Sequence, residues 1–281
     1  MKSSAILSRI RSGFLLVLSG GAARGMAHLG FLKACRDWGV PIKALVGTSS
    51  GAIAGSCYAN PKCSIDEMRI RIRDLSWKEI YRFAWSRSGI FDTRNTESLL
   101  RNALGEDTTI ESLALPFAAS ATSLKSRSLI FLDSGDLASA IAASAALPPI
   151  FTPLWRDDDL LVDGGVISIL PVMGARTLFP ELPVVSVNVN AYRDSQGAPR
   201  PFTTGWPNAF SREPLSGNWI SLSLRLYFLG LVRTLQIEAS QSDWHIEIPG
   251  GQFSLRDRSR MDILFDLGYD AGAKFGEILK D

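Results

Sequence analysis

Two apolar segments, each followed by a glycine-rich turn and then by helical spacing, constrain the fold of this chain most strongly. The first is Phe14–Leu18, which leads into residues 19–25, and the second is residues 43–46, which lead into residues 47–51. A strand that turns through glycine into a helix, twice in succession, is typical of a parallel sheet covered by helices. The sequence therefore predicts an α/β fold, a three-layer α/β/α sandwich with a mostly parallel central sheet.

The remaining patterns continue this alternation. Helices are predicted at residues 23–38, 50–59, 65–75, 96–104, 137–146, 218–239 and 261–279. Strands are predicted at residues 117–124, 129–132, 184–189 and 245–248, with a hairpin over 155–162 that delivers Asp163. Residues 1–12 are expected to form a polar tail or a short helix, and residues 13–281 a single domain. The stretch 191–216 is rich in Pro, Gly, Ser and Asn, so we expect a long surface loop and a candidate lid there.

Composition narrows the class of partners. The net charge of +2 gives no field that would attract a polyanion, so nucleic acid is not an expected partner. Cys35, Cys57 and Cys63 form no CxxC pair, which argues against a disulfide framework and favours a cytoplasmic location. The two histidines form no cluster with cysteine, so neither a metal nor another cofactor is expected.

The N-terminus imitates a signal peptide. Lys2, Arg9 and Arg11 precede the apolar run Phe14–Leu18. The run is short for a signal peptide, and cleavage after it would remove the glycine turn that follows. We therefore interpret it as a buried first strand, with a signal peptide as the alternative.

The second turn, Gly47-Thr48-Ser49-Ser50-Gly51, fits the pattern G-x-S-x-G between a strand and a helix. In a nucleophile elbow the serine occupies a sharp turn, so the residues two before and two after it must be small. The helix dipole would also place positive character near Ser49. The alternative is a tight turn in which serine only caps the helix.

The first turn is suited to holding an anion. Gly20, Gly21, Ala22, Arg24 and Gly25 lie between a strand and a helix, where exposed backbone N–H groups converge. The segment has neither the G-x-G-x-x-G spacing of a dinucleotide site nor the Gly-Lys-Ser/Thr of a P-loop. The anion is therefore better interpreted as a tetrahedral oxyanion. Arg24 could either hold the loop through carbonyl groups or face the anion.

Asp163 is the candidate catalytic carboxylate. It follows a predicted strand and precedes two glycines, although an Asp-Gly turn is also a common structural feature. A carboxylate can serve as the base for a serine directly. Of the two histidines, His28 is expected to be packed or capping and His245 to be structural or exposed, so a Ser-His-Asp triad is disfavoured.

Three ordered motifs carry a family resemblance. The glycine-rich turn with Arg24, the elbow around Ser49 and the Asp163-Gly164-Gly165 segment together resemble the patatin-like phospholipase family of plant patatins and bacterial relatives. Supporting segments are Ala27-His28-Leu29-Gly30, Leu147-Pro148-Pro149-Ile150-Phe151, Leu170-Pro171-Val172 and Leu267-Gly268-Tyr269. The resemblance runs from about residue 14 to the C-terminus and is weakest at 191–240.

The resemblance implies a Ser–Asp dyad that cleaves fatty-acyl esters of phospholipids, lysophospholipids or neutral lipids through an acyl-enzyme. Ser49 would be the nucleophile and Asp163 its base, and the N–H groups of Gly21 and Ala22 would hold the oxyanion beside Arg24. Ala22 departs from the family, which usually has glycine there. A positive φ at Ala22 would cost on the order of 1–2 kcal/mol. Ser50 also departs from the family, where alanine is common.

Two other classes of function stay open. One is a carboxylesterase or thioesterase with the same dyad and no role at membranes, and the other is a non-catalytic, ligand-binding relative. In residues 77–87, Trp77, Tyr81, Phe83 and Trp85 alternate with basic residues. We interpret this segment as an ordinary, partly buried helix, with peripheral contact with an anionic membrane surface as the alternative hypothesis. Residues 222–235 would either line an acyl groove or form core, and no motif indicates an oligomeric state.

Overall fold

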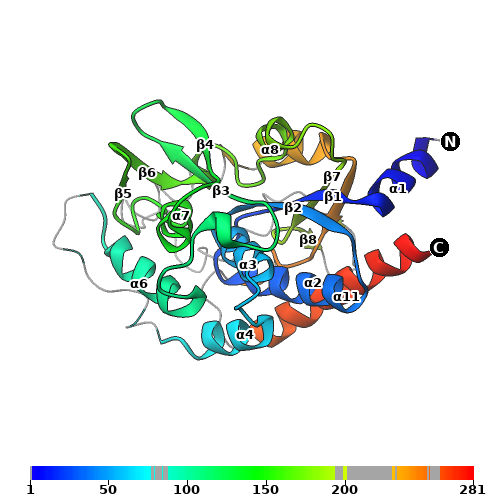
Figure 1. Cartoon of the computed structure of the whole chain (residues 1–281), viewed down its shortest axis with the longest axis horizontal. Coiled ribbons are helices and arrows are strands. Elements are labelled where there is room, and N and C mark those ends of the chain that lie inside the picture. The colour runs from blue at the N-terminus through cyan, green and yellow to red at the C-terminus, as the bar shows by residue number, and fades with distance from the viewer. Residues whose placement is uncertain are drawn as a thin grey trace.

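A twisted, mixed sheet forms the centre of the molecule (Figure 1). The computed structural model describes residues 2–76, 79, 84, 88–193, 199–200, 230–231, 233–251, 253 and 260–281. Within these residues, eight strands form one sheet in the order β10-β7-β1-β2-β3-β6-β5, and β4 pairs with β3. The pairs from β10 to β3 are parallel, whereas β4, β5 and β6 join through antiparallel pairs.

Strands and helices alternate along much of the chain. The strands of this sheet are β1 (Phe14–Leu18), β2 (Ile42–Thr48), β3 (Phe117–Ser123), β4 (Ser128–Leu132), β5 (Leu154–Arg156), β6 (Asp159–Asp163), β7 (Val184–Asn188) and β10 (Trp244–Glu247). The α-helices are α1 (Lys2–Ser12), α2 (Met26–Asp37), α3 (Ser50–Ala59), α4 (Ile65–Asp74), α6 (Thr93–Leu104), α7 (Leu137–Ser144), α8 (Val172–Leu178) and α11 (Met261–Lys280). Short 3₁₀ turns are η1 (Ala22–Gly25), η2 (Ile110–Ser112) and η3 (Gly164–Val166).

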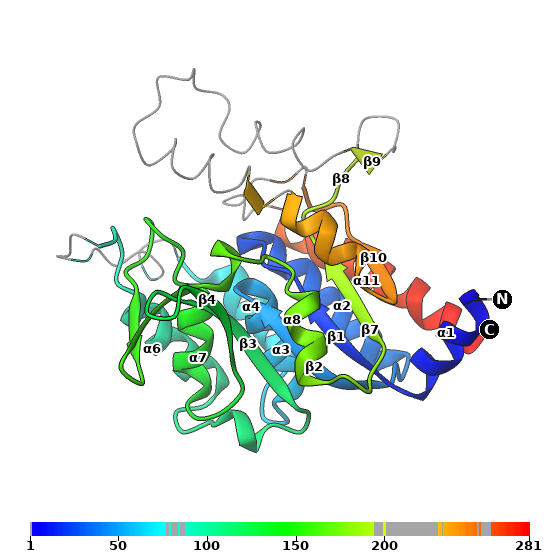
Figure 2. The ribbon, with the colours of Figure 1, turned by 90° about the horizontal axis from the view of Figure 1, so that it is seen from above.

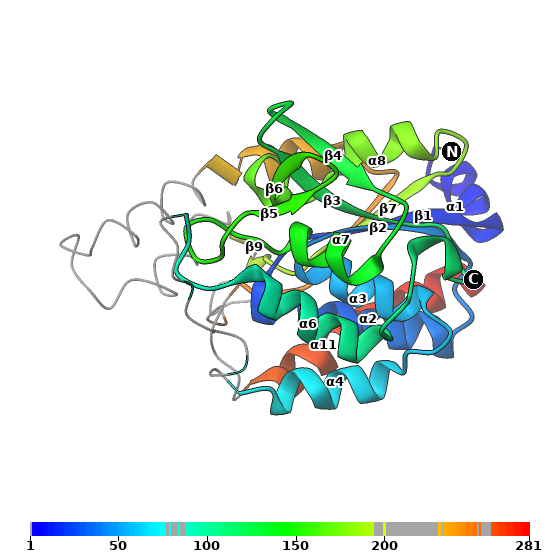
Figure 3. The same ribbon diagram turned by 60° about the vertical axis from the view of Figure 1, so that its left-hand side comes forward.

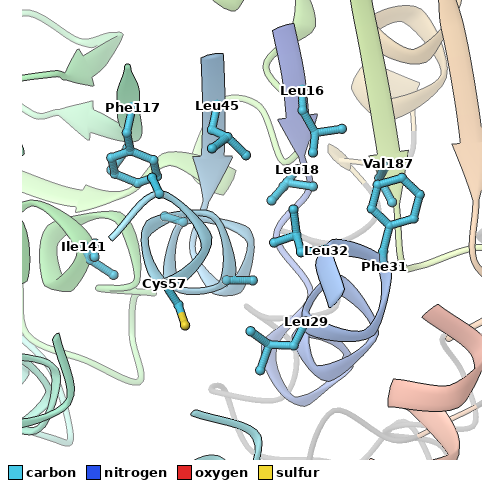
Figure 4. Close-up of a cluster of buried hydrophobic side chains, with 14 of the residues drawn as sticks. Leu16, Leu18, Leu29, Phe31, Leu32, Leu45, Cys57, Phe117, Ile141 and Val187 are labelled. Carbon is cyan, nitrogen blue, oxygen red and sulfur yellow. The ribbon is translucent and has the colours of Figure 1, made fainter. Parts of the chain in front are cut away.

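Helices cover both faces of the sheet, which gives the predicted α/β/α sandwich (Figures 2 and 3). Successive side chains of β1 point to opposite faces, so Leu16 and Leu18 enter one core while Leu15 and Val17 enter the other. The first core packs under α2, α3, α7 and α11, and Figure 4 shows part of it. The second core lies under α8 and the helical residues 233–240. Burial on both faces explains why β1 is apolar at every position.

The helices α2 and α11 approach each other at glycines. A side chain at Gly30 would collide with the backbone of Phe265, and one at Gly268 would collide with the backbone of Ala27. Two segments that the family resemblance singled out therefore form one close helix–helix contact. Phe275 of α11 adds an edge-to-face contact with Phe14 of β1, at 5.8 Å between ring centroids.

The structure confirms most predicted elements, with boundaries that shift by a few residues. Residues 1–12 contain the helix α1. The predicted helix at 23–38 is divided, because η1 turns the chain before α2 begins. The predicted loop at 191–216 is wrong where it is described, since β8 (Tyr192–Arg193) pairs with β9 (Pro199–Arg200). Most of that loop, most of residues 77–87 and all of residues 218–229 lie outside the described residues.

The apolar segment near residue 230 contributes to core where it is described. Leu231 and Leu235 are buried, with 3% and 6% of their surface exposed.

None of the helices in the described ranges is long and apolar enough to cross a bilayer.

Candidate active site

Ser49 lies between β2 and α3 in a strained backbone conformation. Its φ of 52° and ψ of −119° place a non-glycine residue in a region that costs on the order of 1–3 kcal/mol. The conformation is held in part by a hydrogen bond of 2.9 Å from the Ser49 N–H to Ser144 Oγ at the end of α7. The turn therefore presents the side chain at the carboxyl end of β2, as the G-x-S-x-G pattern predicts.

The two glycines of this turn are required by close backbone contacts. A Cβ at Gly47 would lie 2.5 Å from the N atom of Ala52, and a Cβ at Gly51 would lie 2.6 Å from the carbonyl oxygens of Leu18 and Ser19. No side chain fits at either position without displacing backbone. The start of α3 is thus pressed against the ends of both β1 and β2.

Asp163 ends β6 and is buried, with 4% of its surface exposed. Its Oδ1 accepts a hydrogen bond of 2.7 Å from the Gly165 N–H, and the Ser49 side chain lies close enough to the carboxyl group to lower its pKa. Burial raises the pKa of Asp163 from 3.8 to about 7, and the Gly165 N–H and the Ser49 side chain oppose part of that rise. A carboxyl group with a pKa near neutrality can both accept and return a proton.

The glycine-rich turn lies against the elbow. A Cβ at Gly20 would be 3.5 Å from Ser49 Cβ, and the Gly20 N–H already donates to the carbonyl of Ile169. Gly20 is therefore a packing residue and not an oxyanion donor. Gly25 lies over Ser50, where a Cβ would meet the serine side chain. Within the described residues, the N–H groups of Gly21 and Ala22 donate no hydrogen bond.

Ala22 has a φ of 50°, the positive value that its side chain disfavours. We expect Ala22→Gly to raise the free energy of unfolding by about 1 kcal/mol, because glycine adopts this φ without the steric penalty. Denaturant unfolding measures the change. The matched control is Ala23→Gly in the same turn, which should lower stability, and an equal loss in both variants would contradict the expectation.

Arg24 points into the protein and holds the turn through oxygen acceptors. It is fully buried and donates to the carbonyl groups of Phe253 and Gly251 and to Asn190 Oδ1 at 2.9–3.2 Å. Burial lowers its pKa to about 10. Of the two roles that the sequence left open, the described contacts favour the structural one.

Neither histidine contacts Ser49 or Asp163. His28 is buried in α2, where its Nε2 donates to the Ser19 carbonyl at 2.8 Å, and burial lowers its pKa to about 4. His245 Nδ1 lies 2.7 Å from the hydroxyl of Ser186 on the neighbouring strand β7. Both side chains therefore serve packing and hydrogen bonding within the scaffold.

Two supporting residues were missed from the sequence. Ser144 accepts the Ser49 N–H, and Asn190 connects the glycine turn by donating to the Gly20 carbonyl at 2.8 Å while it accepts from Arg24. Ser144 is a polar residue in an alanine-rich helix, and Asn190 follows the end of β7. Neither belongs to a local motif, so only the packing of distant segments reveals them.

In the part of the chain that the structure describes, no group of three His, Cys, Asp or Glu side chains could hold a metal ion.

Comparison with known proteins shows which family the chain belongs to. A family model described as patatin-like phospholipase matches residues 16–176. An uncharacterized NTE family protein of Mycobacterium tuberculosis is 31% identical over 201 residues, which cover 70% of this chain and 55% of the relative. Patatin-like phospholipase domain-containing protein 7 of Rattus norvegicus is 29% identical over 95% of this chain and 21% of its own length. Lysophospholipase NTE1 of Coccidioides immitis is 27% identical over 95% of this chain and 18% of its own length.

The chain thus spans about half the length of the mycobacterial relative and about a fifth of the other two. Among solved structures, VipD from Legionella pneumophila matches with a TM-score of 0.48 and 14% identity, over 95% of this chain and 67% of that chain. The family model covers more than half of the 281 residues and includes the glycine turn, the elbow and Asp163. The chain therefore belongs to the patatin-like phospholipase family.

Proposed function

We propose that the chain is a serine acyl hydrolase that cleaves fatty-acyl esters of lipids with Ser49 and Asp163. The observation that carries the proposal is the position of the Ser49 side chain beside the buried Asp163 carboxyl group, whose pKa is raised to about 7. Supporting it are the strained turn that presents Ser49 and the N–H groups of Gly21 and Ala22, which donate no hydrogen bond within the described residues. The names of the relatives, which include lysophospholipase and phospholipase, favour a lipid ester as the substrate.

The proposed reaction has two halves. The Ser49 hydroxyl gives its proton to Asp163 while its oxygen attacks the ester carbonyl carbon, and the Gly21 and Ala22 N–H groups bind the oxyanion. Asp163 then protonates the departing alcohol, which leaves an acyl group on Ser49. In the second half Asp163 takes a proton from water, and the resulting hydroxide attacks the acyl carbonyl and releases the fatty acid. The proton then returns to the serine.

A fluorophosphonate probe tests the nucleophile directly. It should add once to the folded protein, at Ser49, and peptide mass spectrometry locates the adduct. Lysophospholipid micelles and a short water-soluble ester then compare substrates, with a higher kcat/KM expected for the micellar lipid. A labelled protein that prefers the short ester would favour a carboxylesterase or thioesterase, and a folded protein that takes no label would favour a non-catalytic relative.

We also propose peripheral contact with a lipid surface through an apolar rim beside Asp163. The rim consists of Val166, Ile167, Met173 and Ile237, which expose 36%, 36%, 53% and 49% of their surfaces. Glu238 holds their segments together, since its carboxylate accepts from Ser168 Oγ and from the Met173 N–H. Such exposed apolar side chains next to a lipid-cleaving site fit the acyl region of a bilayer better than water.

Vesicle flotation checks this contact. We expect the wild type to float with vesicles that contain an anionic phospholipid, and the double variant Met173→Asp and Ile237→Asp to bind several-fold less. The control is Ile278→Asp, which alters a residue of similar character, 37% exposed, near the end of α11. Equal flotation of both variants, or no flotation of the wild type at low salt, would remove the proposal.

A further inference from the structure

Two cysteine side chains meet at the far end of α3, away from Ser49. Cys57 lies in the last turn of α3, and Cys63 lies in the short connection that leads to α4. Their Sγ atoms are 2.7 Å apart, and both thiols are free. A disulfide has a sulfur–sulfur distance of about 2.05 Å, so bond formation needs only a small movement. Figure 4 shows the Cys57 sulfur pointing away from the sheet.

The connection between α3 and α4 is built so that Cys63 returns to the helix end. Asn60 accepts the Cys63 N–H through its carbonyl at 3.1 Å and the Lys62 N–H through its Oδ1 at 2.9 Å. Its side-chain amide in turn donates to the Leu104 carbonyl at 2.8 Å. The turn is therefore anchored to α6, and the proximity of the two thiols follows from its hydrogen bonds.

The two thiols differ in reactivity. Cys57 is fully buried, whereas Cys63 keeps 9% of its surface exposed. The hydrogen bond between the two side chains lowers the pKa of Cys63 and raises that of Cys57. Arg36 and Arg71 lower the pKa of Cys63 further, while burial and Glu67 oppose them. Cys63 is thus the sulfur that a small oxidant reaches first, and it is the better nucleophile.

We propose that Cys57 and Cys63 are a reversible dithiol–disulfide site whose oxidant is a hydroperoxide. The Cys63 thiolate attacks one oxygen of hydrogen peroxide, which breaks the O–O bond, releases hydroxide and leaves a sulfenic acid. The Cys57 sulfur then attacks the Cys63 sulfur and displaces hydroxide, which leaves as water with the Cys57 proton. Two thiols lose two electrons, which reduce one peroxide to water. A thiol reductant restores both thiols by exchange.

Peptide mapping of the wild type tests the proposal without any substitution. The folded protein is treated with hydrogen peroxide, quenched with catalase, blocked with a maleimide in denaturant and digested with trypsin. Lys62 separates the two cysteines, so cleavage yields peptides 44–62 and 63–69. We expect these peptides to be joined by a disulfide, and dithiothreitol to separate them.

Counting blocked thiols in the intact protein gives a second readout. Oxidation should lower the number of maleimide adducts from three to one, because Cys35 remains free. The matched control is Cys35→Ser, a change at another buried cysteine, in which the number should fall from two to zero. In Cys63→Ser no intramolecular disulfide should form. Three blocked thiols in oxidised wild type, or peptides 44–62 and 63–69 that never link, would overturn the proposal.

Discussion

Ser49→Ala is expected to lower kcat/KM for ester hydrolysis by about 10⁴-fold or more, because removal of a nucleophile leaves only binding and the oxyanion site. The backbone should keep its shape, since the hydrogen bond from residue 49 to Ser144 uses the main-chain N–H. Fatty-acid release from lysophospholipid micelles measures the loss. Circular dichroism and thermal unfolding of the same preparation report the fold.

The neighbouring serine provides the matched control. The Ser50 hydroxyl is buried and has no hydrogen-bond partner among the described residues, so Ser50→Ala removes no hydrogen bond. We expect its activity to change by less than about threefold, or less than about 0.7 kcal/mol in activation free energy, because the substitution breaks no hydrogen bond. If Ser49→Ala retained substantial activity, or if both variants lost activity equally, the elbow would not supply the nucleophile.

The second large effect is a pH dependence of stability that comes from the titration of Asp163. The folded pKa of about 7 lies above the unfolded value of 3.8, so the native protein binds the additional proton between these values. The contribution of Asp163 to stability therefore falls as the pH rises from about 4 to 7 and then levels off. An asparagine side chain in this place would carry no charge at any pH. We compare the free energy of unfolding of Asp163→Asn with that of the wild type. From about pH 4 to about pH 7 the difference should shift in favour of the variant by about 4 kcal/mol, at about 1.36 kcal/mol per pKa unit.

Urea unfolding at several pH values between 4 and 8 measures this difference. The control is Asp159→Asn on the same strand, because hydrogen bonds from Ser123, Lys125 and Leu160 lower the pKa of Asp159. Its removal should therefore lower stability by about the same amount throughout this range, because the contribution of Asp159 is lost only as the pH falls below its unfolded pKa of 3.8. A difference between wild type and Asp163→Asn that does not depend on pH would show that Asp163 titrates normally.

Activity should show the complementary pattern. The base must be ionised to accept the serine proton, so kcat/KM of the wild type should fall about tenfold per pH unit below 7 and be constant above it. Asp163→Asn should lose turnover at every pH. A stable and inactive variant would separate the role of this carboxylate in the reaction from any role in the fold.

The sequence by itself determined the class of fold and the three segments of the candidate site. Glycine at positions 47 and 51 and the apolar runs before each turn are local requirements of a strand that bends sharply into a helix, so they can be read from short windows. The order of strands could not be read in this way. It depends on which strands pair over long separations, as when β7 adds beside β1.

Tertiary structure alone decided how the candidate residues work together. Burial of Asp163 places its pKa near 7, and that burial comes from strands and helices far apart in the chain. The direction of Arg24 was open in the sequence, because carbonyl groups of Gly251 and Phe253 became its acceptors only on folding. The supporting roles of Ser144 and Asn190 were likewise invisible, since a hydrogen bond between distant residues leaves no local pattern. Local steric requirements depend on neighbouring residues, so they can be predicted from the sequence. Desolvation and long-range hydrogen bonds arise only in the packed molecule.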